Sequence, residues 1–338
     1  MSSEDPQAIS TRFKNFADII TGGQSGYGQI YTAVHDLNAL FLELGAADPN
    51  AGMYHAGTNL SSGFAISTGE AARCMFDLAR TVKFSRGLIK AIKHKKKLTP
   101  GMTVRVLYAG CGPYALLALL AIPCFSETEV KFTAIDIHES SVDSAKKLAA
   151  ALGLENYFDE IIQADAFDYS FSEKDILLVE VMQQALRKEP QVSVAAALAV
   201  QLSEGGIMIP ERITIKPAFT DLKKRDAIML NSDPGFSSSF EYNSIADLDL
   251  RSVFKVAKDF SNPFPVKKII LDESYLGPGF VLELFTIIKV WNDEILSGFD
   301  SAITLPLLIA RGEELSGKKS VTFNYRNDAL PGFNWEAE

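Results

Sequence analysis

The feature that most constrains the fold is a regular alternation of apolar runs and helical segments between residues 103 and 209. The apolar runs have the length of buried strands, and the segments between them repeat apolar residues at spacings of three and four. In chain order, these strands and helices are TVRVLYAG, ALLALLAI, VKFTAIDI, SSVDSAKKLAAALGL, FDEIIQADAFD, DILLVE, VSVAAALAVQLSEGG and GIMIP. Strands that alternate with helices form parallel sheets with right-handed crossovers. The sequence therefore predicts an α/β fold with a doubly wound, Rossmann-like sheet.

Two segments of different character flank this sheet. The first 66 residues predict one or two helices that end at Gly45, with the glycine-rich stretch TGGQSGYG as a break. After about residue 213 the chain becomes rich in strand-forming residues, in the runs VFKVAKDF, VKKIILDES, GFVLELFTIIKVW, SAITLPLLIA and SVTFNYR. In the last of these runs, Val321, Phe323 and Tyr325 alternate with polar neighbours, which predicts a strand with one buried face. We expect this C-terminal region to be mostly antiparallel.

A long amphipathic helix is predicted to begin near residue 67. Ser67 followed by Glu70 has the spacing of an N-terminal capping box. Apolar residues then repeat at helical intervals from Met75 to Ile89. A second face of the same helix carries Asp77, Arg80, Thr81 and Phe84.

The composition disfavours several classes of protein. The 33 basic and 42 acidic residues give a formal net charge of −9, and phosphate neutralisation requires a basic surface, so we expect no nucleic-acid partner. The one basic cluster, KAIKHKKK at residues 90–97, is predicted to be a solvated helix end. The three cysteines and four histidines lack metal-ligand spacing, which indicates reduced thiols in a cytoplasmic protein and no metal site. Neither a signal pattern nor a membrane-spanning apolar run is present, so no membrane partner is expected.

Glycines and acidic residues follow the first three predicted strands. Gly110 and Gly112 come directly after the first strand, where glycine lets the backbone approach a ligand closely. Asp136 ends the second strand, and its carboxylate can accept both hydroxyl hydrogens of a ribose. Asp165 and Ala166 end the third strand, where an adenine would lie. Because the carboxyl ends of parallel strands meet at one sheet edge, we expect a nucleoside-containing cofactor there. No P-loop lysine follows the turn, which disfavours ATP.

Two glutamates follow the fourth predicted strand, in the stretch EVMQQALRKE. Glu189 lies nine positions after Glu180, and on a continuous helix this separation would point the two side chains to opposite sides. Convergence on one ligand therefore requires a bent loop. Two convergent carboxylates suit a guanidinium, which offers five donors in a planar fork, although an amine or amidine also fits. In the competing interpretation, Glu180 caps a helix and Glu189 pairs with Arg187 or Lys188 on the surface.

These motifs resemble the class I S-adenosylmethionine-dependent methyltransferases, and among them the protein arginine methyltransferase family, over roughly residues 67–220. The resemblance is carried by DLARTVKF, which matches the family's D-x-x-R-T-x-x-[YF] helix, by VRVLYAGCGPY with FTAIDIHESS, and by EVMQQALRKE with GGIMIPERI. It implies S-adenosyl-L-methionine as the cofactor, Arg80 as the ligand of the cofactor's carboxylate, and Asp77 as a residue that helps to position the acceptor.

The sequence departs from the family at three places. Tyr114 stands where the family has the third glycine of its turn, and its side chain either closes over the cofactor or fills the space that the glycine leaves. Tyr108 stands where the family has an acidic residue before the first glycine. The family's Thr-His-Trp element, a part of its acceptor site, is absent from the sequence. This absence favours a small-molecule acceptor over a protein arginine.

The leading hypothesis is therefore an N-methyltransferase that acts on a guanidino or amino group of a small, arginine-like molecule. Methyl transfer would be an in-line (SN2) displacement, with Glu180 and Glu189 holding the acceptor. The alternatives are a small-molecule O- or C-methyltransferase, a protein arginine methyltransferase, and a cofactor-binding protein without turnover. We expect a helical extension or lid over residues 1–66, a cofactor-binding domain over 67–212, and a β-rich acceptor and oligomerisation domain over 213–338. By analogy with its relatives, the chain is expected to form a homodimer.

Overall fold

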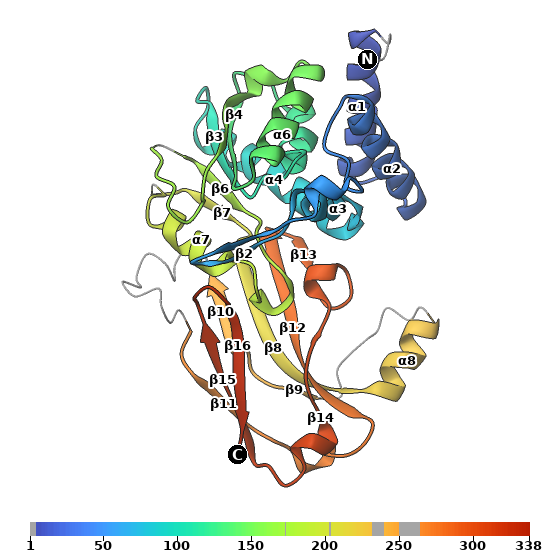
Figure 1. Ribbon diagram of the computed structural model, residues 1–338, viewed down its shortest axis with the longest axis vertical. Helices are drawn as coiled ribbons and strands as arrows, with labels where there is room; N and C mark the ends of the chain where they lie inside the picture. Colours follow the sequence, from blue (N-terminus) through green and yellow to red (C-terminus); the bar gives the residue numbers. More distant parts are fainter. Residues whose placement is uncertain (1–4, 173, 203, 232–239, 250–263) are drawn as a thin grey trace.

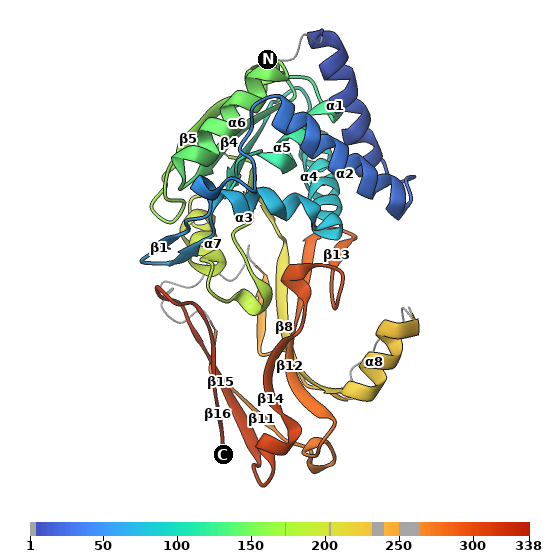
Figure 2. The same ribbon diagram turned by 45° about the vertical axis from the view of Figure 1, so that its right-hand side comes forward.

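The computed structural model describes residues 5–172, 174–202, 204–231, 240–249 and 264–338 (Figure 1). A domain with a parallel sheet forms one end of the molecule, and an elongated antiparallel β region forms the other. The N-terminal helices lie against the parallel-sheet domain, as Figures 1 and 2 both show. The predicted strand VFKVAKDF falls at residues 253–260, outside the described residues.

Five strands form the parallel sheet, in the order β5-β4-β3-β6-β7. They are β3 (Val104–Ala109), β4 (Val130–Asp136), β5 (Phe158–Gln163), β6 (Ile176–Val179) and β7 (Ile207–Ile209), and the connecting helices are α5 (Leu116–Ala121), α6 (Glu139–Ala151) and α7 (Gln191–Ala199). The prediction of a doubly wound sheet is confirmed. Chain order reverses between β3 and β6, which creates a crevice at the carboxyl ends of these two strands, where open α/β sheets bind ligands.

Two helices and a short hairpin precede the sheet. The helices are α1 (Pro6–Thr21) and α2 (Tyr27–Glu43), and the hairpin consists of β1 (Thr58–Leu60) and β2 (Gly63–Ala65). The predicted glycine-rich break lies between the two helices. Gly45 has a φ of +82°, a left-handed conformation that ends helices and that glycine adopts without strain. Both helices pack against α4 (Leu78–Leu98), and α1 also packs against α5.

The prediction of one long helix from residue 67 is wrong in one respect, because the helix is interrupted before Arg80. The segment is divided into α3 (Thr68–Arg73), a 3-10 turn (Cys74–Phe76) and α4 (Leu78–Leu98). The capping box is present, since Ser67 Oγ accepts a hydrogen bond from Glu70 N at 3.2 Å and Ser67 N donates to Glu70 Oε2 at 3.0 Å. Asp77 then has a non-helical ψ of 88°, and its Oδ1 accepts from Arg80 N at 3.2 Å. Asp77 is therefore an N-cap that starts a new helix.

The basic cluster at the end of α4 is also less solvated than predicted. Lys95 is only 6% exposed, and its Nζ lies 3.3 Å from Asp175 Oδ1. Lys90 Nζ donates to Asp293 Oδ1 at 2.6 Å and to Glu294 Oε1 at 2.5 Å. For these two lysines the prediction of a solvated helix end is wrong, because they neutralise carboxylates of neighbouring elements.

The C-terminal region is antiparallel, as predicted. One sheet contains β8 (Arg212–Asp221), β9 (Phe240–Glu241), β10 (Ala246–Asp249), β12 (Phe280–Trp291), β13 (Glu294–Leu296) and β14 (Leu307–Arg311), and a second contains β11 (Lys267–Ile270), β15 (Ser320–Arg326) and β16 (Gly332–Ala337). Val321, Phe323 and Tyr325 of β15 are buried, as their alternation predicts. The helix α8 (Leu222–Asn231) stands apart from the strands in both views (Figures 1 and 2).

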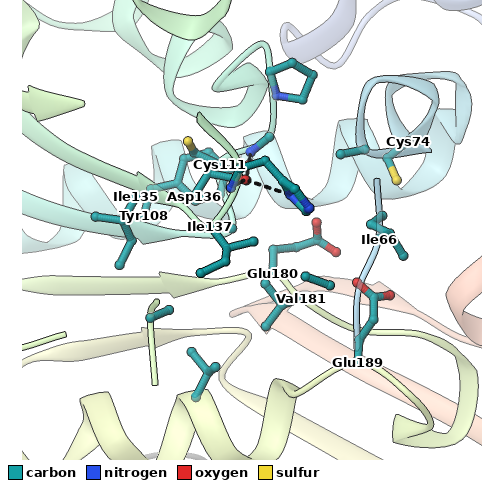
Figure 3. A pocket seen from close by; sticks show the side chains of 18 of the residues that line it. Ile66, Cys74, Tyr108, Cys111, Ile135, Asp136, Ile137, Glu180, Val181 and Glu189 are labelled. Carbon is teal, nitrogen blue, oxygen red and sulfur yellow. Dashed lines mark hydrogen bonds and ion pairs between the residues drawn. The ribbon is translucent and has the colours of Figure 1, made fainter. Parts of the chain in front are cut away.

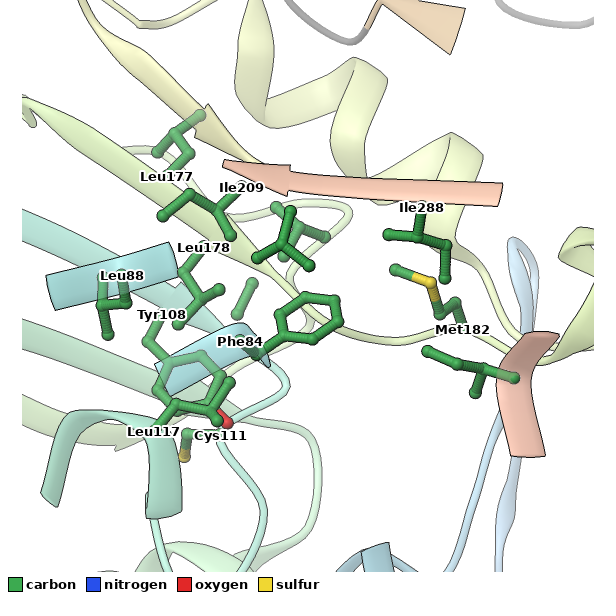
Figure 4. Packing of buried hydrophobic residues seen from close by; sticks show 14 of the residues in the cluster. Phe84, Leu88, Tyr108, Cys111, Leu117, Leu177, Leu178, Met182, Ile209 and Ile288 are labelled. Atoms are coloured by element: carbon green, nitrogen blue, oxygen red, sulfur yellow. The ribbon is translucent and has the colours of Figure 1, made fainter. Parts of the chain in front are cut away.

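One buried apolar cluster extends from the parallel sheet into the β region (Figure 4). It contains Phe84 of α4, Leu178 of β6 and Ile288 of β12. Met182, which lies between the two glutamates of interest, is 1% exposed and belongs to the same cluster. Burial of such a side chain contributes about 1.5–3 kcal/mol, so the loop that carries the glutamates is anchored in the core.

Candidate functional site

A pocket opens at the carboxyl edge of the parallel sheet. Its empty volume is about 1020 Å³ with open solvent included, and it lies at the switch point where open α/β sheets bind ligands. Nine of the residues predicted from the sequence line it, namely Arg80, Gly110, Gly112, Tyr114, Asp136, Asp165, Ala166, Glu180 and Glu189. The fold therefore brings together residues that lie up to 109 positions apart in the chain, from Arg80 to Glu189.

The turn after β3 forms the base of the pocket. Gly110 and Gly112 have φ values of +75° and +62°, in the left-handed region that side chains disfavour. A Cβ atom on Gly110 would also lie 2.3 Å from Cγ1 of Val181. Glycine at position 110 is therefore required both by the backbone conformation and by the close approach of the chain that follows β6.

The carboxylate of Asp136 is fixed by backbone groups at the end of β4. Its Oδ2 accepts a hydrogen bond from Gly112 N at 2.9 Å, and its Oδ1 accepts from His138 N at 3.0 Å. The ring of His138 in turn lies 3.1 Å from Thr58 Oγ1 of the β1–β2 hairpin, measured from Nε2. A carboxylate has about four acceptor positions, so Asp136 keeps acceptor capacity for a ligand in the pocket.

Asp165 and Ala166 line the pocket just beyond the end of β5. Asp165 Oδ1 accepts from Phe167 N at 2.9 Å, a local turn of the kind that aspartate forms readily. This turn gives the chain after β5 a defined path along the pocket.

Tyr114 lines the pocket, but its hydroxyl is directed to the N-terminal helices. The hydroxyl donates to the carbonyl oxygen of Ala47 at 2.9 Å and lies 3.3 Å from Asn38 Oδ1. Its ring packs on Phe41, with centroids 5.1 Å apart. Burial raises the pKa of Tyr114, so the phenol is neutral. Of the two interpretations of this residue, the contacts favour the one in which it fills the space of the missing glycine.

The chain between the two glutamates bends back on itself. Ala185, Leu186 and Lys188 have φ values of +53°, +56° and +65°, which interrupt any helix. As a result, Glu180 and Glu189 both point into the same pocket (Figure 3). The side chain of Glu180 is 9% exposed and Glu189 is 6% exposed. The competing interpretation, in which they are a helix cap and a surface ion pair, is wrong.

Gln191 closes the base of this loop. Its Oε1 accepts from Val181 N at 3.0 Å, and its Nε2 donates to the carbonyl oxygen of Val179 at 3.0 Å. The side chain is fully buried at the start of α7. It therefore satisfies two backbone groups that β6 leaves unpaired where it ends.

The rest of the loop is held by elements that are distant in sequence. Ala185 N donates to Thr286 Oγ1 of β12 at 2.9 Å, and the Tyr325 hydroxyl of β15 donates to the carbonyl oxygen of Leu186 at 2.9 Å. Phe64 N of the hairpin donates to the carbonyl oxygen of Lys188 at 2.8 Å. The N-terminal extension and the β region thus both shape the glutamate loop.

A buried ion pair lies where the loop meets α4. Arg80 Nη2 donates to Glu180 Oε2 at 2.5 Å, and both side chains are almost fully buried. Burial opposes the charge on Arg80, but the carboxylate of Glu180 holds the pKa of Arg80 well above the ordinary value. Burial also raises the pKa of Glu180, and Arg80 counteracts this rise.

Glu189 is in a different electrostatic state. Burial raises the pKa of Glu189 to about 8. The charge of Arg80 lowers this pKa, and repulsion from Glu180 raises it further. Gln183 donates a side-chain hydrogen bond to Glu189. This raised pKa favours the carboxylic acid form of Glu189, beside the Arg80–Glu180 ion pair.

Asp77 is the predicted site residue that does not line the pocket. Its Oδ2 accepts from Ser301 Oγ at 2.6 Å and from Ala302 N at 2.8 Å, in a 3-10 turn (Ala302–Thr304) of the β region. Its other oxygen caps α4 at Arg80 N. Asp77 therefore joins the β region to the start of the helix that carries Arg80, and a role in positioning the acceptor stays a prediction.

Several pocket residues were not predicted from the sequence. They are Leu60, Ala65 and Ile66 around the hairpin, Cys74, Tyr108, Cys111, His138 and Val181. The hairpin turn is Ser61–Ser62, which lacks the Asn-Gly or Asp-Gly pair that marks such turns. Cys111 and Val181 lie next to predicted residues and Tyr108 lies two positions before Gly110, so proximity in the sequence was the available signal for them. Burial raises the pKa of Cys74 and of Cys111, which keeps both as thiols.

Two classes of feature are absent from the part of the chain that the structure describes. No group of three or more His, Cys, Asp or Glu side chains there could hold a metal ion. No helix there combines the length and the apolar character that crossing a bilayer requires.

Neither a protein-family model nor a curated protein matches the sequence. Solved structures do match the fold. One is the Trypanosoma brucei PRMT1 enzyme–prozyme heterotetrameric complex with AdoHcy, at a TM-score of 0.52 and 14% identity over 80% of this chain and 93% of that chain. Another is PRMT6 with SAH, at a TM-score of 0.50 and 13% identity over 75% of this chain and 96% of that chain. At this level of identity the likeness shows a shared fold, and function has to be argued from the site.

Proposed function

We propose that this chain is an S-adenosylmethionine-dependent N-methyltransferase that acts on a guanidino or amino group of a small, arginine-like molecule. One observation carries the proposal. A single pocket at the switch point of the sheet holds a glycine turn with an acidic residue on one side and two convergent, buried glutamates on the other. The first half suits a nucleoside, and the second suits a planar cation.

The cofactor half supports S-adenosylmethionine as follows. Backbone at Gly110 and Gly112 would pack against the methionine portion, and Asp136 would accept the hydroxyl hydrogens of the ribose. Asp165 and Ala166 would flank the adenine. Arg80 would bind the carboxylate of the methionine portion. The similar structures contain AdoHcy and SAH according to their names, which agrees with this assignment.

The acceptor half suits the transfer of a methyl group to nitrogen. The nitrogen lone pair attacks the methyl carbon, a carbon–nitrogen bond forms, the carbon–sulfur bond breaks, and S-adenosylhomocysteine leaves. The methylated nitrogen then loses a proton, and an ionised Glu189 can accept it. Glu180 would stay ionised and hold the guanidinium in line with the sulfonium methyl.

The acceptor class follows from the charges around Glu189. Glu180 and Glu70 both act on it as negative charges, and Arg80 is the cation near them. A cationic acceptor would therefore compensate the negative charges in this half of the pocket best. The missing Thr-His-Trp tripeptide favours a free small molecule.

The test is incubation of the purified protein with methyl-labelled S-adenosylmethionine and three acceptors, which are L-arginine, an arginine-rich peptide and a hydroxylated carboxylic acid. We expect the label to appear on arginine. Label on the peptide alone would indicate a protein arginine methyltransferase, and label on the hydroxy acid alone would indicate an O-methyltransferase. Cofactor binding without transfer to any member of a metabolite panel would indicate a protein without turnover.

We also propose that the chain forms a homodimer, to which the β region contributes. The Trypanosoma brucei complex is a heterotetramer by its name, so a similar fold occurs in an assembly. Light scattering coupled to size-exclusion chromatography measures the mass directly, and a mass near the 36.9 kDa of one chain would contradict the proposal.

A further inference from the structure

Arg80 has an unusual position among the charges of the pocket. Of the described residues that line the pocket, it is the only lysine or arginine. It contacts Glu180, a residue of the acceptor half, through Nη2. Yet in the proposed function its partner is the carboxylate of the cofactor. One guanidinium therefore serves two carboxylates that belong to different halves of the site.

One buried guanidinium carries a single positive charge, so it can neutralise one carboxylate but not two. In the structure, Arg80 neutralises Glu180, which leaves Glu180 little attraction for an external cation. A second carboxylate beside Arg80 would draw part or all of the guanidinium away and would repel Glu180 as a like charge. Glu180 would then be left undercompensated in a buried site, which is costly unless another cation arrives.

We propose that the carboxylate of the cofactor competes with Glu180 for Arg80, so that cofactor binding frees Glu180 to hold a cationic acceptor. This inference rests on the proposed function and extends it. Arg80 becomes a positioning residue that acts on the acceptor through Glu180. The cofactor binds first and the acceptor second, since the acceptor site gains its negative charge only when the cofactor is present. Because such coupling is reciprocal, a bound cation also tightens cofactor binding.

The first experiment measures ethylguanidinium binding to the wild-type protein by calorimetry. Ethylguanidinium has no carboxylate that would compete for Arg80. Three states are compared, which are the protein alone, with saturating S-adenosylhomocysteine, and with saturating adenosine. We expect S-adenosylhomocysteine to tighten binding by roughly 5- to 150-fold, the usual range of coupling between sites. Adenosine fills the nucleoside region but lacks the carboxylate, so it should leave the affinity within about twofold of the protein alone.

The second experiment uses Glu180→Gln. This variant removes the competitor for Arg80 and leaves a buried guanidinium without its partner, so S-adenosylhomocysteine should bind more tightly than to the wild type, by about tenfold or more. Glu189→Gln is the matched control, because Glu189 makes no hydrogen bond to Arg80 and acts on it only through space. The affinity of the Glu189→Gln variant for S-adenosylhomocysteine should differ from that of the wild type by less than about threefold.

The outcomes are distinct. If S-adenosylhomocysteine does not bind the wild type at all, both the proposed function and this inference are overturned. If it binds, but adenosine promotes ethylguanidinium binding equally well or neither ligand does, only the inference fails. Weaker binding of S-adenosylhomocysteine by Glu180→Gln would mean that Glu180 merely supports Arg80. Should that variant not fold, the wild-type comparison of S-adenosylhomocysteine with adenosine decides alone.

Discussion

The two halves of the pocket, which are proposed to bind the cofactor and the acceptor, are built in different ways. In the cofactor half, Gly112 and Asp136 come from adjacent strands and bond to each other directly, through Gly112 N and Asp136 Oδ2 at 2.9 Å. In the acceptor half, the loop between the glutamates is held by Thr286 and Tyr325, which lie 101 and 139 positions away from their partners in the loop. The hairpin adds a third support through Phe64.

This difference indicates what each half depends on. The cofactor half depends on the parallel sheet, whose strands and turns are specified by local sequence. The acceptor half depends on how the N-terminal extension and the β region pack around one bent loop. Changes far from the chemistry should therefore alter acceptor binding while cofactor binding persists, and the following predictions test that separation.

The largest difference between the effect on the acceptor half and the effect on the cofactor half is expected for Glu189→Gln. An amide can neither accept a proton nor attract a cation, so kcat/KM with a guanidino acceptor should fall by about 10²- to 10⁴-fold. Steady-state kinetics measure this loss, and calorimetry with S-adenosylhomocysteine measures the cofactor half, which should be nearly unchanged. A much smaller loss of activity would favour the O- or C-methyltransferase alternative, and a parallel loss of cofactor affinity would show that the two halves are not separable.

The reverse separation is expected for Asp136→Asn. The amide keeps the shape but loses the charge that accepts from Gly112 N and His138 N, and charge-assisted hydrogen bonds contribute about 1.5–3 kcal/mol. Affinity for S-adenosylhomocysteine should fall by roughly 10- to 100-fold, as measured by calorimetry. The nearby Asp168→Asn is the control, since Asp168 is exposed and does not line the pocket. An equal loss in both variants would contradict a special role for Asp136.

The acceptor half should also respond to pH through Glu189, whose pKa burial raises to about 8. With S-adenosylhomocysteine bound, affinity for ethylguanidinium should rise with pH until Glu189 is fully ionised and then level off, because the ionised carboxylate binds the cation. Titration calorimetry at several pH values measures this slope, and Glu189→Gln should abolish it. A slope that persists in the variant would assign the titration to another group.

The same shift has a defined effect on stability. The pKa of Glu189 in the folded protein lies above its ordinary value of 4.5, so between these values the native state holds a proton that the unfolded state releases. The contribution of Glu189 to stability is therefore complete below pH 4.5 and is lost as the pH rises through 8. Thermal unfolding of the wild type and of Glu189→Gln over this interval should show the difference, with the wild type losing more stability.

The smallest effect is expected for Thr286→Val in the β region. Valine leaves Ala185 N without its acceptor, which corresponds to about 0.5–1.5 kcal/mol, so KM for the acceptor should rise by about two- to tenfold. Cofactor affinity should stay constant. Thr220→Val is a matched control, because Thr220 is equally buried and its hydroxyl has no hydrogen-bond partner among the described residues. Equal effects of the two substitutions on KM would exclude a specific role for Thr286.

The sheet and the cofactor half could be predicted because their signals are local. Apolar runs at the period of strands, glycines after the first strand and Asp136 after the second specify the turn and its acidic residue without distant information. The bend between Glu180 and Glu189 was predicted only as a requirement of convergence. The sequence shows no turn pair there, and residues with side chains, such as Ala185 and Lys188, adopt positive φ values because distant groups hold them.

The parts that could not be predicted depend on contacts between distant segments. The Arg80–Glu180 pair joins residues 100 positions apart, and Asp77 bonds to Ser301 at a separation of 224. In the sequence, Asp77 and Arg80 have the spacing of neighbours on one helix face. In the structure, the carboxylate of Asp77 caps Arg80 N, which identifies Asp77 as the start of a new helix. Helical periodicity alone continues through such a break.

Transfer of this pocket to another scaffold would have to preserve the contacts of Tyr114 with the N-terminal segment. The tyrosine hydroxyl is bonded to the carbonyl oxygen of Ala47, and its ring rests on Phe41. A shortened chain that lacked residues 1–50 would therefore expose a large aromatic ring and strip a buried hydroxyl of its acceptor, right beside the glycine turn. The first two helices therefore have to be retained in any shortened version of the chain.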